Sequence, residues 1–333
     1  MVAKVTVGIT TYNLDKYIST CLDSILCQKT NFKFSILVVD DASTDNTVSI
    51  LKSYKERFPS VIDVIYKRTN EGSLKSSNLL FSKIKTQYFS FIDGDDLWVS
   101  NTRLQEAIDF LDKNVHYAMY AGNCRYMVND QIGDFVTPTE MCNKTYTYDD
   151  YANGACPFIH TSGIVLRNVV YCFGIPSEYI KYANTIYDCV FRGEDIRFAD
   201  HIRKGPVFVT DKQYSIYRIH NKGLWQGSSQ IKRTIESCLQ SLLYQRLFPE
   251  MKSLCQKRFL DNYHNLMSIV FNQYNVSDLD HTLFINFFNE IHSINYDCWT
   301  MVSSDIKKSD SMLKMKKSKR IQKVVRKIVN ILK

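Results

Sequence analysis

Hydrophobic and polar positions alternate regularly along the first 115 residues. Short apolar runs typical of strands cover residues 4–10, 34–40, 61–66 and 88–92. Apolar residues recur at helical spacing between and after these runs, over residues 16–28, 43–58, 73–85 and 101–114. Strands that alternate with helices in this way predict an α/β fold, a parallel sheet covered by helices on both faces.

The pattern changes twice after residue 115. Short strands are predicted at 117–127, 162–167 and 207–218, with a helix at 194–204. Long helical stretches follow at 230–247, 251–274 and 279–299, and a Ser/Lys-rich link at 303–311 leads to a last amphipathic helix. We therefore expect an α/β domain over 1–229, with halves of about 1–115 and 116–229, then a helical region over 230–302 and a tail over 303–333.

Composition narrows the class of protein. Hydrophobic residues make up 45% and charged residues 23% of the 333 residues, the balance of a soluble globular protein. No run of about 18 apolar residues is present, and the N-terminus alternates like a strand instead of showing the apolar core of a signal peptide. The 10 cysteines form no C-x-x-C pair, so free thiols are expected and a zinc site is not. These features predict a cytoplasmic protein.

The formal net charge of +8 comes from the tail. Residues 303–333 hold 11 of the 42 Lys and Arg residues and 2 of the 34 Asp and Glu residues, so the rest of the chain is nearly neutral. These basic residues surround an apolar stripe, which comprises Ile321, Val324, Val325, Ile328 and Ile331. The stripe could pack on the body, but such a face is typical of helices that lie on anionic membranes. Because the tail has no aromatic residue to stack on bases, we expect a membrane partner and no nucleic acid.

Polar residues directly follow three of the predicted strands. Thr10–Asn13 follows the first strand, and five carboxylates follow the second and the fourth: Asp40, Asp41, Asp93, Asp95 and Asp96. The carboxyl ends of parallel strands meet at one edge of a sheet, where ligands bind. Like charges gathered there need a cation or hydrogen-bond donors. Carboxylates without nearby Cys or His favour Mg²⁺ or Mn²⁺, typically shared with phosphates. A simple role in turn formation is the alternative, above all for Asp40.

Four motifs in this order resemble the signature of the family 2 glycosyltransferases with the GT-A fold. They are VTVGITTYN over 5–13, VVDDASTD over 38–45, NEG over 70–72 and FIDGDD over 91–96. CLDSILCQ over 21–28 matches the family's first helix. Weaker matches continue to about residue 229: GEDIRF over 193–198, YRIH over 217–220, and the pair Ser228 and Ser229. The resemblance implies a Rossmann-like, mostly parallel sheet with helices on both faces, followed by a C-terminal helical region. Its nucleotide-sugar half would be about 1–115 and its acceptor half about 116–229.

The resemblance also implies a role for each matching residue. The residues expected to bind the nucleotide-sugar are Thr10, Tyr12, Asn13, Asp41, Lys75, Asp93 and Arg218. The expected metal ligands are Asp95, Asp93 and His220. Asp195 would be the general base, and the acceptor side would include Glu194, Asp96 and Trp98.

Three positions depart from the family pattern. Ile9 stands where the family usually has Pro, and Ala42 where it usually has Gly. Ser77 replaces an Arg on the side of the nucleotide base, and the resemblance leaves Lys75 as the residue to substitute for it.

The resemblance implies an inverting glycosyltransferase of bacterial surface-polysaccharide assembly. It would move a sugar from a nucleotide-diphospho-sugar, with a UDP-sugar as the expected donor, to a hydroxyl of a glycan or lipid-linked acceptor. Mn²⁺ or Mg²⁺ would be the cofactor, and the tail would hold the enzyme on the inner face of the cell membrane. Two alternatives stay open. A sugar-nucleotide pyrophosphorylase is disfavoured because Thr10–Asn13 stands in place of a Gly-rich phosphate loop. The other is a non-catalytic scaffold that binds a membrane or nucleic acid through the tail.

Overall fold

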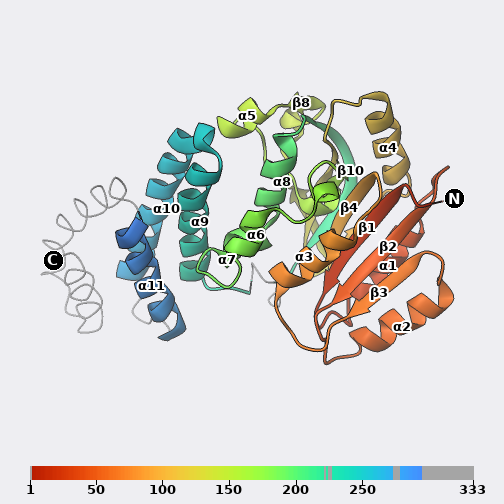
Figure 1. Ribbon diagram of the computed structural model, residues 1–333, viewed down its shortest axis with the longest axis horizontal. Helices are drawn as coiled ribbons and strands as arrows, with labels where there is room; N and C mark the ends of the chain where they lie inside the picture. The colour runs from red at the N-terminus through yellow and green to blue at the C-terminus, as the bar shows by residue number, and fades with distance from the viewer. Residues whose placement is uncertain (1, 221–222, 224–226, 273–277, 295–333) are drawn as a thin grey trace, which may run out of the picture. The chain divides into compact units, whose positions relative to one another are not determined.

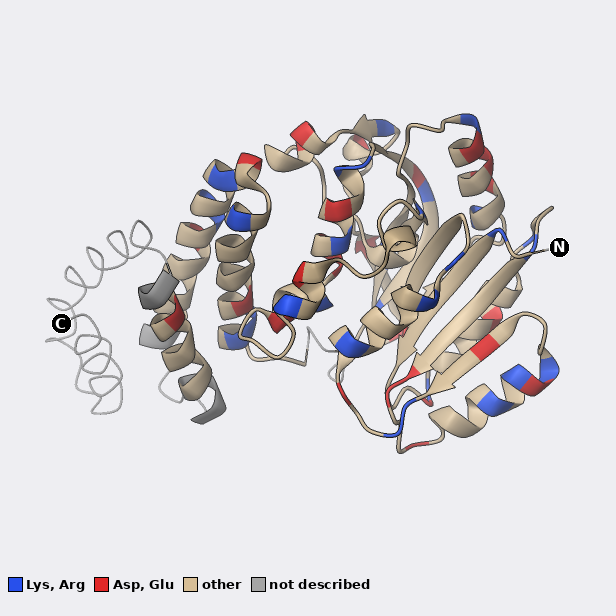
Figure 2. Ribbon diagram, viewed as in Figure 1, with Lys and Arg blue, Asp and Glu red and all other residues tan. Residues whose placement is uncertain are grey.

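The computed structural model describes residues 2–220, 223, 227–272 and 278–294 (Figure 1). The chain divides into two compact units, Met1–Asn221 and Lys222–Lys333. Lys and Arg occur together with Asp and Glu along several of the described helices (Figure 2). Other helices carry one charge sign: the charged residues of the helix over 73–83 are Lys75 and Lys83, and those of the helix over 148–152 are Asp149 and Asp150.

The first half of unit 1 is the predicted parallel α/β layer. Its strands are β1 (Val5–Thr11), β2 (Phe34–Asp40), β3 (Ile62–Tyr66) and β4 (Tyr88–Asp93). They lie in the order β3-β2-β1-β4, and all three pairings are parallel. The helices between and after them are α1 (Ile18–Leu26), α2 (Thr47–Arg57), α3 (Ser73–Lys83) and α4 (Arg103–Lys113). The eight elements predicted in this region are confirmed, with ends that differ by a few residues.

The second half of unit 1 extends the same sheet with mixed direction. Its strands are β6 (Met119–Val128), β7 (Gln131–Phe135), β8 (Lys144–Tyr146), β9 (Ile164–Arg167) and β10 (Val207–Ile219). The two-residue strand β5 (Leu97–Trp98), which precedes α4, joins the same part of the sheet. The sheet continues β4-β9-β6-β10-β5. β9 is antiparallel to both β4 and β6, whereas β10 is parallel to β6. The predicted parallel arrangement therefore holds for β1 to β4, and the second half of the sheet is mixed.

Short helices fill the connections of this second half. They are α5 (Tyr148–Ala152), α6 (Ser177–Lys181) and α7 (Asp188–Arg192), with 3₁₀ turns at Thr139–Met141, Thr161–Gly163 and Tyr171–Phe173. The longer α8 (Glu194–Ile202) confirms the helix predicted at 194–204. The five-residue helices were not predicted because so short a segment has too few positions to show a helical period.

Two hydrophobic cores cover the two faces of the sheet. Strand β2 serves both, because Ile36 and Val38 point into one core while Leu37 and Val39 point into the other. The first core contains buried residues of α1, α2 and α4, and the second contains buried residues of α3 and α8. This double burial explains why Phe34–Asp40 is almost continuously apolar. The apolar interior of the strand is buried in this way, and the polar residues lie at the strand ends.

Unit 2 consists, as described, of helices α9 (Gln230–Leu247), α10 (Lys252–Asn272) and α11 (Asp278–Ile294) and a 3₁₀ turn at Pro249–Met251. Ser229 caps α9, since its Oγ accepts a hydrogen bond of 3.1 Å from the N–H of Lys232. The predicted helices at 230–247, 251–274 and 279–299 are confirmed as far as the described residues reach. The predicted tail lies outside them. Among the described helices, none combines the length and the apolar character needed to cross a bilayer.

Candidate active site

The ends of β1, β2 and β4 bring the predicted polar residues to one edge of the sheet. Thr10 on β1 lies in register with Val39 on one side and with Asp93 on the other. The next residue, Thr11, lies in register with Asp40. The expectation that residues following different strands meet at one edge is therefore confirmed for these positions.

The loops after β1 and β2 are tied to each other by Asn13. Its backbone N–H donates to Ser43 Oγ at 2.9 Å, and its side-chain Oδ1 accepts from the N–H of Thr44 at 2.8 Å. Asn13 adopts a left-handed backbone conformation with φ of 54°, which Asn tolerates better than most residues. Asn13 thus holds the two loops together, and its Oδ1 is already engaged within the protein.

Asp40 shapes the turn that follows β2. The side chain is 1% exposed, and its two oxygens accept from the N–H and Oγ of Ser43 at 3.0 and 2.5 Å. Turn formation, the alternative role considered for Asp40, is therefore what the structure shows. Ala42 in this turn has φ of 62°, a left-handed conformation that costs an L-residue about 1 kcal/mol or more. This conformation gives a physical reason for the glycine usual at that position.

Asp41 forms a buried ion pair with Lys67, a residue that was not predicted to be part of the site. Lys67 Nζ is 2.6 Å from Asp41 Oδ1, and the side chains are 7% and 6% exposed. Lys75, the residue expected to act near the base, has a 43% exposed side chain and lies 3.7 Å from Glu71. Of these two lysines, the structure therefore places Lys67 against Asp41.

The segment after β4 carries the predicted metal-binding carboxylates. Gly94 is closely packed there, because an added Cβ would lie 3.0 Å from Leu14 Cδ1 and 3.2 Å from Ile18 Cδ1, and these two side chains would have to shift by a few tenths of an ångström. Asp95 Oδ2 lies 2.9 Å from His220 Nε2, and the backbone carbonyl of Asp95 accepts from Arg218 Nη1 at 2.8 Å. Strand β10 thus delivers two predicted residues to Asp95 from more than a hundred positions away.

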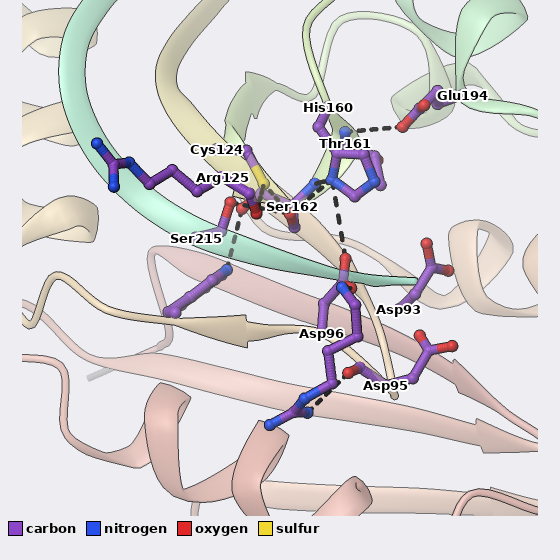
Figure 3. A network of polar contacts seen from close by, with 12 residues as sticks. Asp93, Asp95, Asp96, Cys124, Arg125, His160, Thr161, Ser162, Glu194 and Ser215 are labelled. Carbon is purple, nitrogen blue, oxygen red and sulfur yellow. Dashed lines mark hydrogen bonds and ion pairs between the residues drawn. The ribbon is translucent and has the colours of Figure 1, made fainter. Parts of the chain in front are cut away.

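Asp96 turns away from this surface into the protein interior (Figure 3). It is 0% exposed, and its Oδ1 accepts from the N–H of Arg218 at 3.1 Å. Its Oδ2 lies 3.8 Å from Nδ1 of His160, which contacts Ser162 Oγ at 2.7 Å. Burial raises the pKa of Asp96 well above its ordinary value and lowers that of His160 to about 4. His160 is therefore neutral near pH 7, so its contact with Asp96 belongs to a buried polar network and is not an ion pair.

Trp98 is also buried beneath the site. Its side chain is 4% exposed, its Nε1 donates to the carbonyl of Ser162 at 3.0 Å, and the Arg103 guanidinium lies 3.8 Å from the centre of its ring. The structure thus places Asp96 and Trp98 in the interior, and their expected place on the acceptor side stays a prediction. Strand β5 pairs with β10, with Trp98 opposite Ser215, and this pairing draws both residues under the surface.

Glu194 and Asp195 begin α8, where the helix dipole favours negative charge. Glu194 Oε2 accepts from the N–H of Thr161 at 2.7 Å, so it links α8 to the turn that holds His160 (Figure 3). Burial and the neighbouring Asp195 raise the pKa of Glu194 to about 8. Burial and Asp95 likewise raise the pKa of Asp93. Asp93 and Glu194 therefore carry less negative charge at neutral pH than two carboxyl groups ordinarily would.

A divalent cation fits this site only when it is shared with a ligand. No group of three or more His, Cys, Asp and Glu side chains in the described residues is arranged to hold a metal by itself. The structure instead offers Asp95 and His220 as a pair 2.9 Å apart, with Asp93 two residues before Asp95. Mg²⁺ and related cations are commonly held by one or two carboxylates together with substrate phosphates. The donor set is compatible with that arrangement.

Comparison with known proteins decides the family. Residues 6–172, about half of the chain, match the family model described as glycosyl transferase family 2. The chain belongs to the family 2 glycosyltransferases. This match covers β1 to β4 and includes the motifs after β1, β2 and β4, so the glycosyltransferase name rests on the part of the site that these strands carry, whereas Glu194, Asp195, Arg218 and His220 lie beyond the matched residues.

Similar proteins support this assignment at the level of sequence and fold. The uncharacterized protein Rv1520 of Mycobacterium tuberculosis is 25% identical over 225 residues, which are 67% of this chain and 60% of that protein. This glycosyltransferase chain thus spans about 60% of the first curated relatives it matches. The putative glycosyltransferase EpsE of Bacillus subtilis is 34% identical over 114 residues, 34% of this chain and 40% of EpsE.

A solved structure confirms the predicted GT-A fold. Staphylococcus aureus TarS 1–349, solved in complex with UDP-GlcNAc, superposes with a TM-score of 0.58 and 19% sequence identity. The superposition covers 88% of this chain and 82% of that one. At this level of identity, the likeness concerns the fold alone.

Proposed function

We propose that this glycosyltransferase moves a sugar from a UDP-sugar to a hydroxyl of a glycan or lipid-linked acceptor, with inversion and with Mn²⁺ or Mg²⁺. The observation that carries the proposal is the meeting of Asp95 with His220 and Arg218 at the edge of the sheet. A carboxylate, an imidazole and a guanidinium side by side suit a metal-bound diphosphate. The UDP-GlcNAc bound by the TarS structure is compatible with a uridine donor.

In this proposal, each described residue has a distinct task. Asp95 and His220, with Asp93, would hold the cation, which would supply charge neutralisation of the leaving diphosphate. Arg218 would add a fixed positive charge beside it. Thr10, Tyr12 and Asp41 would surround the nucleoside, since they lie at or beyond the ends of β1 and β2.

Asp195 is the proposed general base. The acceptor hydroxyl would give its proton to this carboxylate as its oxygen attacks the anomeric carbon, and the diphosphate would leave from the opposite face. Glu194 suits this role less well, because Thr161 already donates to its Oε2 and its pKa is raised to about 8 by burial and by Asp195. Asp195 is half-buried in the first turn of α8, and in this proposal it faces the acceptor.

A panel of nucleotide-sugars tests the proposal. Purified full-length protein is incubated with UDP-, GDP-, CDP- and dTDP-sugars, with Mn²⁺ or Mg²⁺, and release of the nucleoside diphosphate is measured. We expect release of UDP, loss of release in EDTA and recovery when metal is restored. Nucleoside diphosphate release that is undiminished in EDTA would contradict the metal, and release from a different nucleotide alone would contradict the donor. No turnover of any sugar would favour a non-catalytic scaffold, and formation of a nucleotide-sugar from nucleoside triphosphate would favour a pyrophosphorylase.

We further propose that residues 303–333 hold the enzyme on the inner face of the cell membrane, near a lipid-linked acceptor. The support is the sequence: this tail, outside the described residues, holds 11 Lys and Arg residues around an apolar stripe. Each basic residue near an anionic bilayer contributes about 1 kcal/mol. Deletion from residue 303 should abolish sedimentation with anionic liposomes while leaving donor hydrolysis almost unchanged. Equal sedimentation of the two proteins at low salt would refute the proposal.

A further inference from the structure

The carboxylate of Asp41 is held by donors on both oxygens. Oδ1 accepts from Lys67 Nζ at 2.6 Å and from the N–H of Glu71 at 3.0 Å. Oδ2 accepts from the N–H of Gly72 at 2.8 Å. A carboxylate offers about four lone-pair positions, two on each oxygen. These contacts therefore leave one acceptor position, and it lies on Oδ2.

Lys67 links Asp41 to the turn before α3 and to α3 itself. Besides Asp41, its Nζ reaches Ser76 Oγ on α3 at 3.1 Å and Glu71 Oε2 at 3.0 Å. An ammonium group has three N–H bonds, so these three partners account for all of them. Lys67 thereby fixes the end of β2, the turn before α3 and α3 itself relative to one another, with Asp41 at the centre.

The charge of Lys67 also fixes the chemical state of Asp41. Burial acts to raise the pKa of Asp41, but the bonds from Lys67 and from the two backbone N–H groups outweigh it and lower the pKa below its ordinary value. Asp41 is therefore an ionised group that accepts hydrogen bonds and cannot donate one.

A single fixed acceptor distinguishes between nucleobases. Uracil presents one N–H at N3, which the remaining position on Asp41 can accept. Cytosine presents a bare N3 acceptor at the same place, so the two lone pairs would repel. Guanine presents adjacent donors at N1 and N2, which need two acceptors. Leaving a buried polar group unpaired costs about 1–3 kcal/mol, enough to select one base over another.

We propose that Lys67 is a positioning residue that aims Asp41 at the base and makes the donor site selective for uridine nucleotides over cytidine and guanosine nucleotides. This inference rests on the proposed function, in which Asp41 faces the nucleoside. Lys67 need not touch the nucleotide, because it acts through Asp41. Lys55 serves as the comparison: it also forms an ion pair, with Asp63 at 2.7 Å, but its side chain is 43% exposed.

Calorimetric titration of the full-length protein with UDP, CDP and GDP tests the inference. The proteins compared are the wild type, Lys67→Met, Lys67→Arg and the control Lys55→Met, each checked for folding by circular dichroism. We expect the wild type to prefer UDP. Lys67→Met should lose about tenfold or more in UDP affinity and much of its preference for UDP over CDP, as expected for loss of a charged hydrogen-bond partner. Lys67→Arg should recover part of the preference, and Lys55→Met should bind like the wild type.

A folded Lys67→Met protein with wild-type affinity and selectivity would overturn the inference, because Lys67 would then serve only to stabilise the local structure. A wild type that binds CDP or GDP as well as UDP would instead contradict the proposed donor. If Lys67→Met does not fold, Asp41→Asn provides the second test. Its amide can rotate to place a donor where the carboxylate had an acceptor, so the UDP-to-CDP affinity ratio should fall at least about tenfold. An unchanged ratio would count against the inference.

Discussion

Asp95→Asn should abolish nearly all sugar transfer while the protein remains folded. The carboxylate lies at the surface end of β4, 2.9 Å from His220 Nε2, and it is the group best placed to share a cation with a diphosphate. An amide keeps the shape of the side chain but removes the charge, so cation and diphosphate binding weaken together. We expect UDP release to fall by about 10²-fold or more, in line with the loss of a group that stabilises a developing charge.

The matched control for this change is Asp109→Asn, an exposed residue of α4 that bonds Gln105. It should retain wild-type turnover and melting temperature. Transfer by Asp95→Asn at more than a tenth of the wild-type rate would show that another group binds the metal-diphosphate. Titration with Mn²⁺ distinguishes two causes of the loss. Excess metal restores turnover if the substitution only weakens metal binding, and it does not restore turnover if the defect lies in the chemical step.

The part of the site that could be predicted is the part built by local sequence. Each motif follows a strand that is apolar enough to recognise, and parallel strands necessarily end at one edge. Thr10 and Asp93 meet in the sheet for this reason. The same logic could have found Lys67. It follows β3, whose Tyr66 pairs with Asp40, so the residues one position further along also lie close to each other.

The part that could not be predicted depends on pairings between distant segments. Asp96 is the last residue of a recognised motif and Trp98 follows it closely, but the strand pairing that buries them cannot be read from the motif. They are buried because the two-residue strand β5 pairs with β10, and because Arg218 donates its N–H to Asp96. Strands as short as β5 and β8 have no period to recognise, and they exist only because a neighbouring strand supplies their hydrogen bonds.

The raised pKa values are also a tertiary effect. Sequence alone indicates five carboxylates near one edge and therefore a large negative charge. In the structure, burial and mutual repulsion raise the pKa of Asp93, Asp96 and Glu194, so that part of this charge is absent at neutral pH. Desolvation of each group depends on what packs over it, which no local pattern specifies.

Asp195→Asn should retain donor binding and lose catalysis. The carboxylate lies in the first turn of α8, apart in sequence from the strand ends that would hold the nucleotide. Without a base, the acceptor hydroxyl must lose its proton to water, and a positioned base contributes about 10²–10⁴-fold. We therefore expect kcat to fall by about 10²-fold or more, while the affinity for UDP measured by calorimetry stays within about twofold of the wild type.

Glu194→Gln is the matched control for Asp195→Asn, because it alters the adjacent carboxyl group in the same way. Burial and Asp195 raise the pKa of Glu194 to about 8, so the wild-type side chain is protonated at pH 7 and glutamine resembles that state. Gln can also accept from the Thr161 N–H through its carbonyl oxygen. The ratio of wild-type to Glu194→Gln activity should stay near one below pH 7 and depart from one only as the pH rises through about 8. If Asp195→Asn instead loses UDP affinity and keeps its single-turnover rate, or if Glu194→Gln causes the larger loss at pH 7, then Asp195 is not the base.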